Sequence, residues 1–147
     1  TGPKKKKKAT GRKRPKIASK KKRRARVCVD LDGVLAAYDG WQGVENFGKP
    51  LPGAIEFTRE LCGWADVIIF TARCRVDDQT HSVAERQALV KAWLDEHGFA
   101  YSEIEAGQGK PFADAYIDDR AVSCRPQDDG PAAFEMAVKL AKTLAER

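Results

Sequence analysis

The sequence predicts a single α/β domain built around a parallel β-sheet. Short apolar segments alternate along the chain with longer segments of helical periodicity, and this alternation is typical of strands joined by crossover helices. The length of 147 residues suffices for one hydrophobic core but not for two. We therefore expect a parallel sheet with helices on both faces, and ligands bound outside the carboxyl ends of its strands.

Short apolar runs bounded by turn residues define the expected strands. Residues 26–31 form such a run and lead into an Asp-Gly pair, and residues 66–71 are the clearest buried strand in the chain. Shorter strands are expected at 100–104 and 113–118, and residues 121–124 are a candidate for a fifth.

Three helices are expected between and after these strands. Residues 53–62 carry an apolar stripe at helical spacing. Ser82 and Glu85 form a capping-box pair that opens a second helix, and Gly98 suits its C-terminal turn. A last helix is expected at 131–145, because its proline is favoured in a first helical turn.

The charge of the chain is divided between two segments. Residues 1–25 hold 14 Lys or Arg and no acidic residue, whereas residues 26–147 hold the other 13 basic residues and all 21 acidic ones, a net charge of −8. The first segment is too polar to offset its ordering entropy, so we expect a disordered basic tail and a folded domain from Arg26. Such a tail attracts polyanions. Nucleic-acid or ribosome association and a solvated tail without a dedicated partner both remain open.

The composition also restricts the setting of the protein. There is no run of about 18 apolar residues that would span a membrane, and no apolar stretch follows the basic N-terminus as in a secretory signal. The four cysteines form no CxxC pair and no zinc-like cluster with histidine. We expect a reducing intracellular compartment, namely the cytoplasm, with the nucleoid or nucleus as alternatives because of the tail.

Polar side chains stand at the ends of the predicted strands. They are Asp30 and Asp32, Thr71, and Asp118 with Asp119, while Lys110 lies in the loop that enters the strand at 113–118. A parallel sheet would gather them at one edge. Clustered carboxylates repel one another unless a cation is bound, and hard oxygen ligands favour Mg²⁺. A lysine and a threonine beside them are suited to holding phosphoryl oxygens.

These residues resemble the four motifs of the haloacid dehalogenase (HAD) superfamily, in the same order. The matching segments are Asp30-Leu31-Asp32-Gly33-Val34-Leu35, Thr71 after Ile68-Ile69-Phe70, Lys110, and Asp118-Asp119 after Tyr116-Ile117. The resemblance covers residues 26–125. It implies a Rossmann-like, HAD-like three-layer sandwich over residues 26–147, and a magnesium-dependent phosphomonoester hydrolase that forms an aspartyl-phosphate.

The resemblance also implies catalytic and metal-binding roles. Asp30 would attack phosphorus, and Asp32 would protonate the leaving oxygen and then activate water. Thr71 and nearby backbone N–H groups would hold the phosphoryl oxygens, and Lys110 would neutralise developing charge. The Asp30 side chain, the Asp32 main-chain carbonyl and Asp119 would bind Mg²⁺. Asp118 is the alternative ligand, or else orients Lys110 or a metal-bound water.

Four further positions are candidates for substrate binding. Gly33 lies within the first motif, and Ala72 directly follows the second. Arg73 either contacts a phosphate or forms a structural ion pair. Trp41 lies in the loop after the first motif, a region that covers the active site in this superfamily, and is a substrate-contacting or gating candidate.

The intervals in which superfamily members carry a cap domain are short here. Residues 36–65 have room for a loop and one helix, and residues 72–109 for one helix and a short strand. An uncapped site admits bulky phosphoesters, and the polynucleotide phosphatases of the superfamily are similar in this respect, so nucleic-acid ends or nucleotides are candidate substrates. The alternative is a nucleic-acid-binding protein that uses a phosphatase-like domain as a scaffold.

Overall fold

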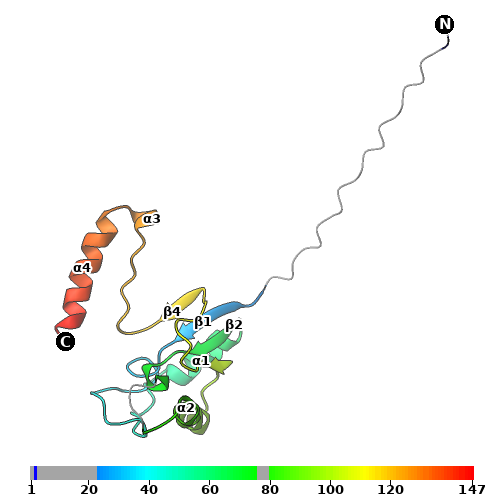
Figure 1. The fold of residues 1–147 in the computed structure, drawn as a ribbon, viewed down its shortest axis with the longest axis vertical. Coiled ribbons are helices and arrows are strands. Elements are labelled where there is room, and N and C mark those ends of the chain that lie inside the picture. The colour runs from blue at the N-terminus through cyan, green and yellow to red at the C-terminus, as the bar shows by residue number, and fades with distance from the viewer. Residues whose placement is uncertain (1, 3–22, 76–79) are drawn as a thin grey trace.

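The computed structural model describes Gly2 and residues 23–75 and 80–147, and its centre is a four-stranded parallel sheet (Figure 1). The strands are β1 (Ala25–Val29), β2 (Ala65–Ile69), β3 (Glu103–Ile104) and β4 (Ala115–Ile117), in the order β3-β2-β1-β4. Because all four run in the same direction, their carboxyl ends meet at one edge. The predicted α/β class with a parallel sheet is confirmed.

The sequence placed the start of the folded domain at Arg26, but ordered contacts begin earlier, at Arg23. The guanidinium of Arg23 lies 2.9 Å from the Asp114 carboxylate, and that of Arg24 lies 3.1 Å from Asp66. Arg24 also donates to the carbonyls of Cys62 and Ala65 at 2.9 Å each. These contacts tie the end of the basic segment to the sheet. The remainder of the predicted tail, apart from Gly2, lies outside the described residues.

Two helices cover one face of the sheet, as the topology requires. The connections β1–β2 and β2–β3 cross the sheet in the same direction, and right-handed crossovers then put α1 (Ala54–Cys62) and α2 (Val83–His97) on the same side. The predicted caps of α2 are confirmed. The Ser82 hydroxyl accepts from the Glu85 N–H at 3.1 Å, and Gly98 adopts a φ of 78°, which favours glycine.

The main core lies between these helices and the sheet. It consists of the strand side chains that point toward the helices, the apolar stripes of the helices, and the aromatic residues behind them. Its principal members are Val27, Val29, Val67, Ile69, Leu61, Val90, Trp93, Leu94 and Phe99. Each such aliphatic side chain contributes about 1.5–3 kcal/mol relative to an exposed position.

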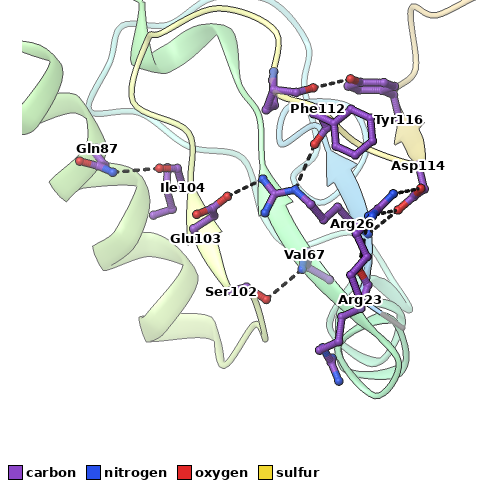
Figure 2. Close-up of polar contacts among 12 residues, drawn as sticks. Arg23, Arg26, Val67, Gln87, Ser102, Glu103, Ile104, Phe112, Asp114 and Tyr116 are labelled. Carbon is purple, nitrogen blue, oxygen red and sulfur yellow. Dashed lines mark hydrogen bonds and ion pairs between the residues drawn. The ribbon is translucent and has the colours of Figure 1, made fainter. Parts of the chain in front are cut away.

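The opposite face is covered by a loop, not by a helix (Figure 2). Arg26 on β1 donates to the Phe112 carbonyl and to Glu103, at 3.1 Å each, and its own N–H donates to Asp114 at 2.8 Å. The Tyr116 hydroxyl donates to the Pro111 carbonyl. The connection from β3 to β4 is thus fastened across this face by polar contacts.

The last helix does not complete the predicted three-layer sandwich. Helix α4 (Ala132–Ala145) lies away from the sheet (Figure 1), buries none of its residues and packs against the short helix α3 (Pro126–Asp129). Phe134 is 58% exposed. The expectation of helices on both faces is therefore wrong for this structure, because an apolar stripe at helical spacing does not specify which surface it packs against.

Two predicted strands are also corrected. Residues 121–124 form no strand, and the Cys124 thiol instead donates to the Ala133 carbonyl at 3.8 Å. The strand predicted at 100–104 is reduced to β3, because side-chain oxygens take over its first pairings. The Ser102 hydroxyl accepts from the Val67 N–H at 2.9 Å, and that of Thr58 accepts from the Ala100 N–H at 3.2 Å.

The described residues between the sheet strands add no second sheet. None of the helices in residues 23–75 and 80–147 is long and apolar enough to cross a membrane. All four cysteines are free, with Cys28 and Cys74 buried, Cys62 partly buried and Cys124 exposed.

Candidate active site at the carboxyl edge of the sheet

Three aspartates converge where β1 and β4 end. Strand pairing places Val29 beside Ile117, and the Asp30 N–H donates to the Ile117 carbonyl at 2.9 Å. The residues that follow these strands are therefore neighbours. Asp30, Asp118 and Asp119 each offer a carboxylate oxygen, and these oxygens lie within 4.8 Å of one another. The structure thus brings together three of the four carboxylates that the sequence singled out.

The environment of Asp30 disfavours its negative charge. Burial, followed by the charge of Asp118 and smaller contributions from Asp119 and Asp32, raises the pKa of Asp30 from 3.8 to about 7. The Leu31 N–H, which donates to the Asp30 carboxylate at 2.9 Å, acts in the opposite direction. A bound cation would offset this repulsion.

The carboxylate of Asp119 is held against Gly33 and retains an unused oxygen. Its Oδ1 is buried and has no hydrogen-bond partner among the described residues. Gly33 has a φ of 85°, and a Cβ at this position would lie 2.4 Å from Oδ2 of Asp119. Glycine is therefore required both by conformation and by close approach. Gly33 thus packs against the acidic cluster, and its role in substrate binding stays a prediction.

This set of donors fits a hard divalent cation. A buried carboxylate oxygen without a partner is costly, and the nearby carboxylates repel one another, so an ion that prefers oxygen ligands would satisfy both conditions. Asp30, Asp118 and Asp119 are the residues available to hold it. The sequence prediction of Mg²⁺ stays a prediction, because acidic clusters also occur without metal.

Asp32 lies apart from the three carboxylates and is bound by Arg73. The Nε and Nη2 atoms of Arg73 donate to the two Asp32 oxygens at 2.7 and 3.0 Å. Nη1 and Nη2 also donate to the carbonyls of Val44 and Asn46, at 3.2 and 2.8 Å. Arg73 is only 3% exposed. Two roles were predicted for Arg73, a phosphate contact and a structural ion pair, and the structure shows the ion pair. The guanidinium N–H groups of Arg73 donate to protein oxygens.

Thr71 and Lys110 lie on the same cavity as the aspartates. Thr71 is buried at the end of β2, where its hydroxyl accepts from the Arg73 N–H at 3.2 Å. Lys110 is exposed, with its Nζ 4.4 Å from the centre of the Tyr116 ring. The cavity has a volume of about 910 Å³. Its walls include these predicted residues: Asp30, Asp32, Trp41, Thr71, Ala72, Arg73, Lys110 and Asp118.

The cavity also has walls that the sequence analysis missed. They are Tyr38, Arg75, Arg86, Glu105 and Arg120, among others. Arg120 directly follows the fourth motif, so its proximity to a strand end could have predicted its place at the cavity. Arg86 is buried on α2 and donates to the Arg73 carbonyl at 3.3 Å. Its position in the helical pattern predicts burial, but not the contact it makes.

The raised pKa of Asp30 makes a prediction about stability. Between pH 4 and pH 7 the folded protein binds more protons at Asp30 than the unfolded chain does, because the folded pKa is about 7 and the ordinary value is 3.8. Without metal, this group therefore costs stability as pH rises through that window. We expect wild type to lose stability relative to Asp30→Asn between pH 5 and pH 8 in EDTA, measured by denaturant unfolding. Mg²⁺ should reverse the loss, and a pH-independent difference would contradict this.

Comparisons with known proteins give little guidance. No protein-family model and no curated protein matches the chain. Among solved structures, the crystal structure of a structural-genomics target from Vibrio cholerae is similar, with 30% identity over 81% of this chain and 98% of that one, at a TM-score of 0.43. A functional assignment therefore depends on the residues around the cavity.

Proposed function

We propose that the protein is a magnesium-dependent phosphomonoester hydrolase of the HAD type that acts through an aspartyl-phosphate on Asp30. The observation that carries the proposal is the convergence of Asp30, Asp118 and Asp119 beside a cavity that Thr71 and Lys110 also line. An anionic nucleophile, a cation site and groups for phosphoryl oxygens are the parts that phosphoryl transfer requires.

The reaction has two steps. An Asp30 oxygen attacks phosphorus as the bond to the leaving oxygen breaks, and Asp32 supplies the proton that this oxygen needs. Asp32 then takes a proton from water, whose oxygen attacks the phosphorus and releases phosphate and the Asp30 carboxylate. Both Asp32 oxygens accept from Arg73 in the structure, so the first step requires that one of these bonds opens and that Asp32 is protonated before the leaving oxygen takes its proton. The ion pair suits Asp32 as the base of the second step.

Thr71 and Lys110 stabilise the transferring group from the other walls. The Thr71 hydroxyl, whose oxygen already accepts from the Arg73 N–H, keeps its proton for donation to a phosphoryl oxygen. Lys110 supplies positive charge. Mg²⁺ would be held by Asp30, the Asp32 main-chain carbonyl and Asp119, with Asp118 as the alternative ligand. Its positive charge would offset the negative charge of the carboxylates and of the phosphoryl oxygens.

Phosphate release tests the proposal directly. The protein should release phosphate from at least one member of a panel of phosphorylated oligonucleotides, nucleotides and sugar phosphates, and EDTA should abolish the release. The proposal fails if folded protein in excess Mg²⁺ releases no phosphate from any of them.

Polyanion binding by the basic segment is a separate prediction. The variant to test lacks residues 1–22 and keeps Arg23 and Arg24, because these two side chains form ion pairs with Asp114 and Asp66 of the folded domain. The kcat on a small phosphoester should not change, whereas affinity for an oligonucleotide should fall. If about six of the 12 deleted positive charges engage phosphates, the slope of log K against log salt should be roughly −5 with the segment present and approach zero without it.

Fluorescence anisotropy with a labelled oligonucleotide measures this slope. An unchanged slope after deletion would place binding on the described domain. A fall in kcat on the small phosphoester would instead mean that the segment acts at the cavity, in place of a cap.

A further inference from the structure

Trp41 is the outermost member of a stack that begins in the core. Trp93, which is buried, stacks on Phe47 with ring centres 5.6 Å apart. The Arg73 guanidinium lies over Phe47, 4.1 Å from the ring centre, and also over Trp41 at 5.1 Å. The stack therefore runs from α2 through Phe47 and Arg73 to Trp41.

Trp41 combines this contact to Arg73 with exposure at the cavity. Arg73 covers one face, yet the residue is 54% exposed and lines the cavity that holds Asp30. Leaving so large an apolar side chain in water forgoes the stabilisation of burial. A ring that is already held in place loses little entropy when a second planar group stacks on it.

The cavity wall carries a second aromatic ring of the same kind. Tyr38 also lines the cavity, and the Arg120 guanidinium lies 6.0 Å from its ring centre. Two aromatic side chains, each with an arginine against it, thus share a cavity with the acidic cluster. A sugar phosphate lacks the planar π-system that stacks flat on such rings, whereas a nucleobase or an aryl group provides one.

The geometry points to Trp41 as a stacking platform that selects phosphoesters carrying a planar ring, such as a nucleobase or an aryl group. This inference rests on the proposed function for its reaction. It adds the residue that distinguishes ring-bearing substrates from others. Arg73 connects the proposed stacking ring with the proposed catalytic residues, because its guanidinium lies over Trp41 and also binds Asp32.

Two substrates that differ only in a ring provide the test. AMP and ribose 5-phosphate share the phosphate and the sugar, and only AMP has the base. We expect Trp41→Ala to lower the ratio of kcat/KM for AMP over ribose 5-phosphate about tenfold, or about 1.4 kcal/mol, since stacking energies are of this order. Trp41→Phe should restore most of the ratio, because it retains an aromatic face.

Trp64 offers a matched control. It is also 54% exposed, but it lies in the turn between α1 and β2 and does not line the cavity. Trp64→Ala should leave the ratio unchanged. An equal fall in kcat/KM for both substrates would mean that Trp41 only holds Arg73 in place, and would rule out the platform. An unchanged kcat/KM for both substrates would rule it out as well.

Tryptophan fluorescence separates this inference from the proposed function. AMP should quench wild-type fluorescence saturably, ribose 5-phosphate should not, and Trp41→Phe should lose the effect. Saturable quenching without any phosphate release would uphold the platform and reject the hydrolase. Phosphate release without quenching or ring preference would uphold the hydrolase and reject the platform.

Discussion

Asp30→Asn is expected to reduce phosphate release by more than about 100-fold, because the amide has the shape of the carboxylate but not its nucleophilic charge. The fold should survive. The side-chain oxygen of asparagine can still accept the Leu31 N–H that Asp30 accepts at 2.9 Å. The variant also removes a carboxylate whose pKa burial and Asp118 raise to about 7. Its resistance to denaturant should therefore equal or exceed that of metal-free wild type above pH 7.

Asp95→Asn is the control for this variant. It makes the same chemical change at an exposed aspartate on α2, whose carboxylate lies 2.6 Å from the Lys91 ammonium. Asp95 does not line the cavity. Its phosphate release should match wild type. Activity of Asp30→Asn above about 1% of wild type on a good substrate would exclude the aspartyl-phosphate mechanism. A radioactive phosphoester should label acid-quenched wild type, and hydroxylamine should remove the label, because it cleaves acyl phosphates. A label that resists hydroxylamine would also exclude the mechanism.

Asp119→Ala is expected to raise the Mg²⁺ concentration needed for half-maximal activity by at least about 100-fold, and Asp118→Ala by about tenfold. The difference follows from their surroundings. Asp119 has a buried oxygen without a partner in the described residues and is packed against Gly33. Asp118 is exposed, and one of its oxygens already accepts the Arg120 N–H at 2.7 Å.

Magnesium titrations of the two variants decide between the aspartates. A larger change for Asp118→Ala would reverse the assignment of the direct ligand. Calcium should bind to wild type but support little turnover, because its longer and more variable coordination disturbs in-line geometry. Circular dichroism should show that both variants remain folded, so that a changed metal requirement is not a folding defect.

The sequence by itself determined the elements whose signals are local. The apolar runs of β1 and β2 and the caps of α2 follow from residues within a few positions of one another. The meeting of Asp30 with Asp118 and Asp119 was also predictable. It requires only that these residues end strands of one parallel sheet, and the alternation of strands and helices indicates such a sheet.

Only the tertiary structure decided which side chains meet across long separations. The Asp32–Arg73 pair, the packing of Gly33 against Asp119 and the stack that ends at Trp41 depend on loop conformations. No local periodicity encodes these conformations. The position of α4 away from the sheet has the same origin. An amphipathic pattern shows that a helix has an apolar face, whereas the partner of that face is set by the path of the chain before it.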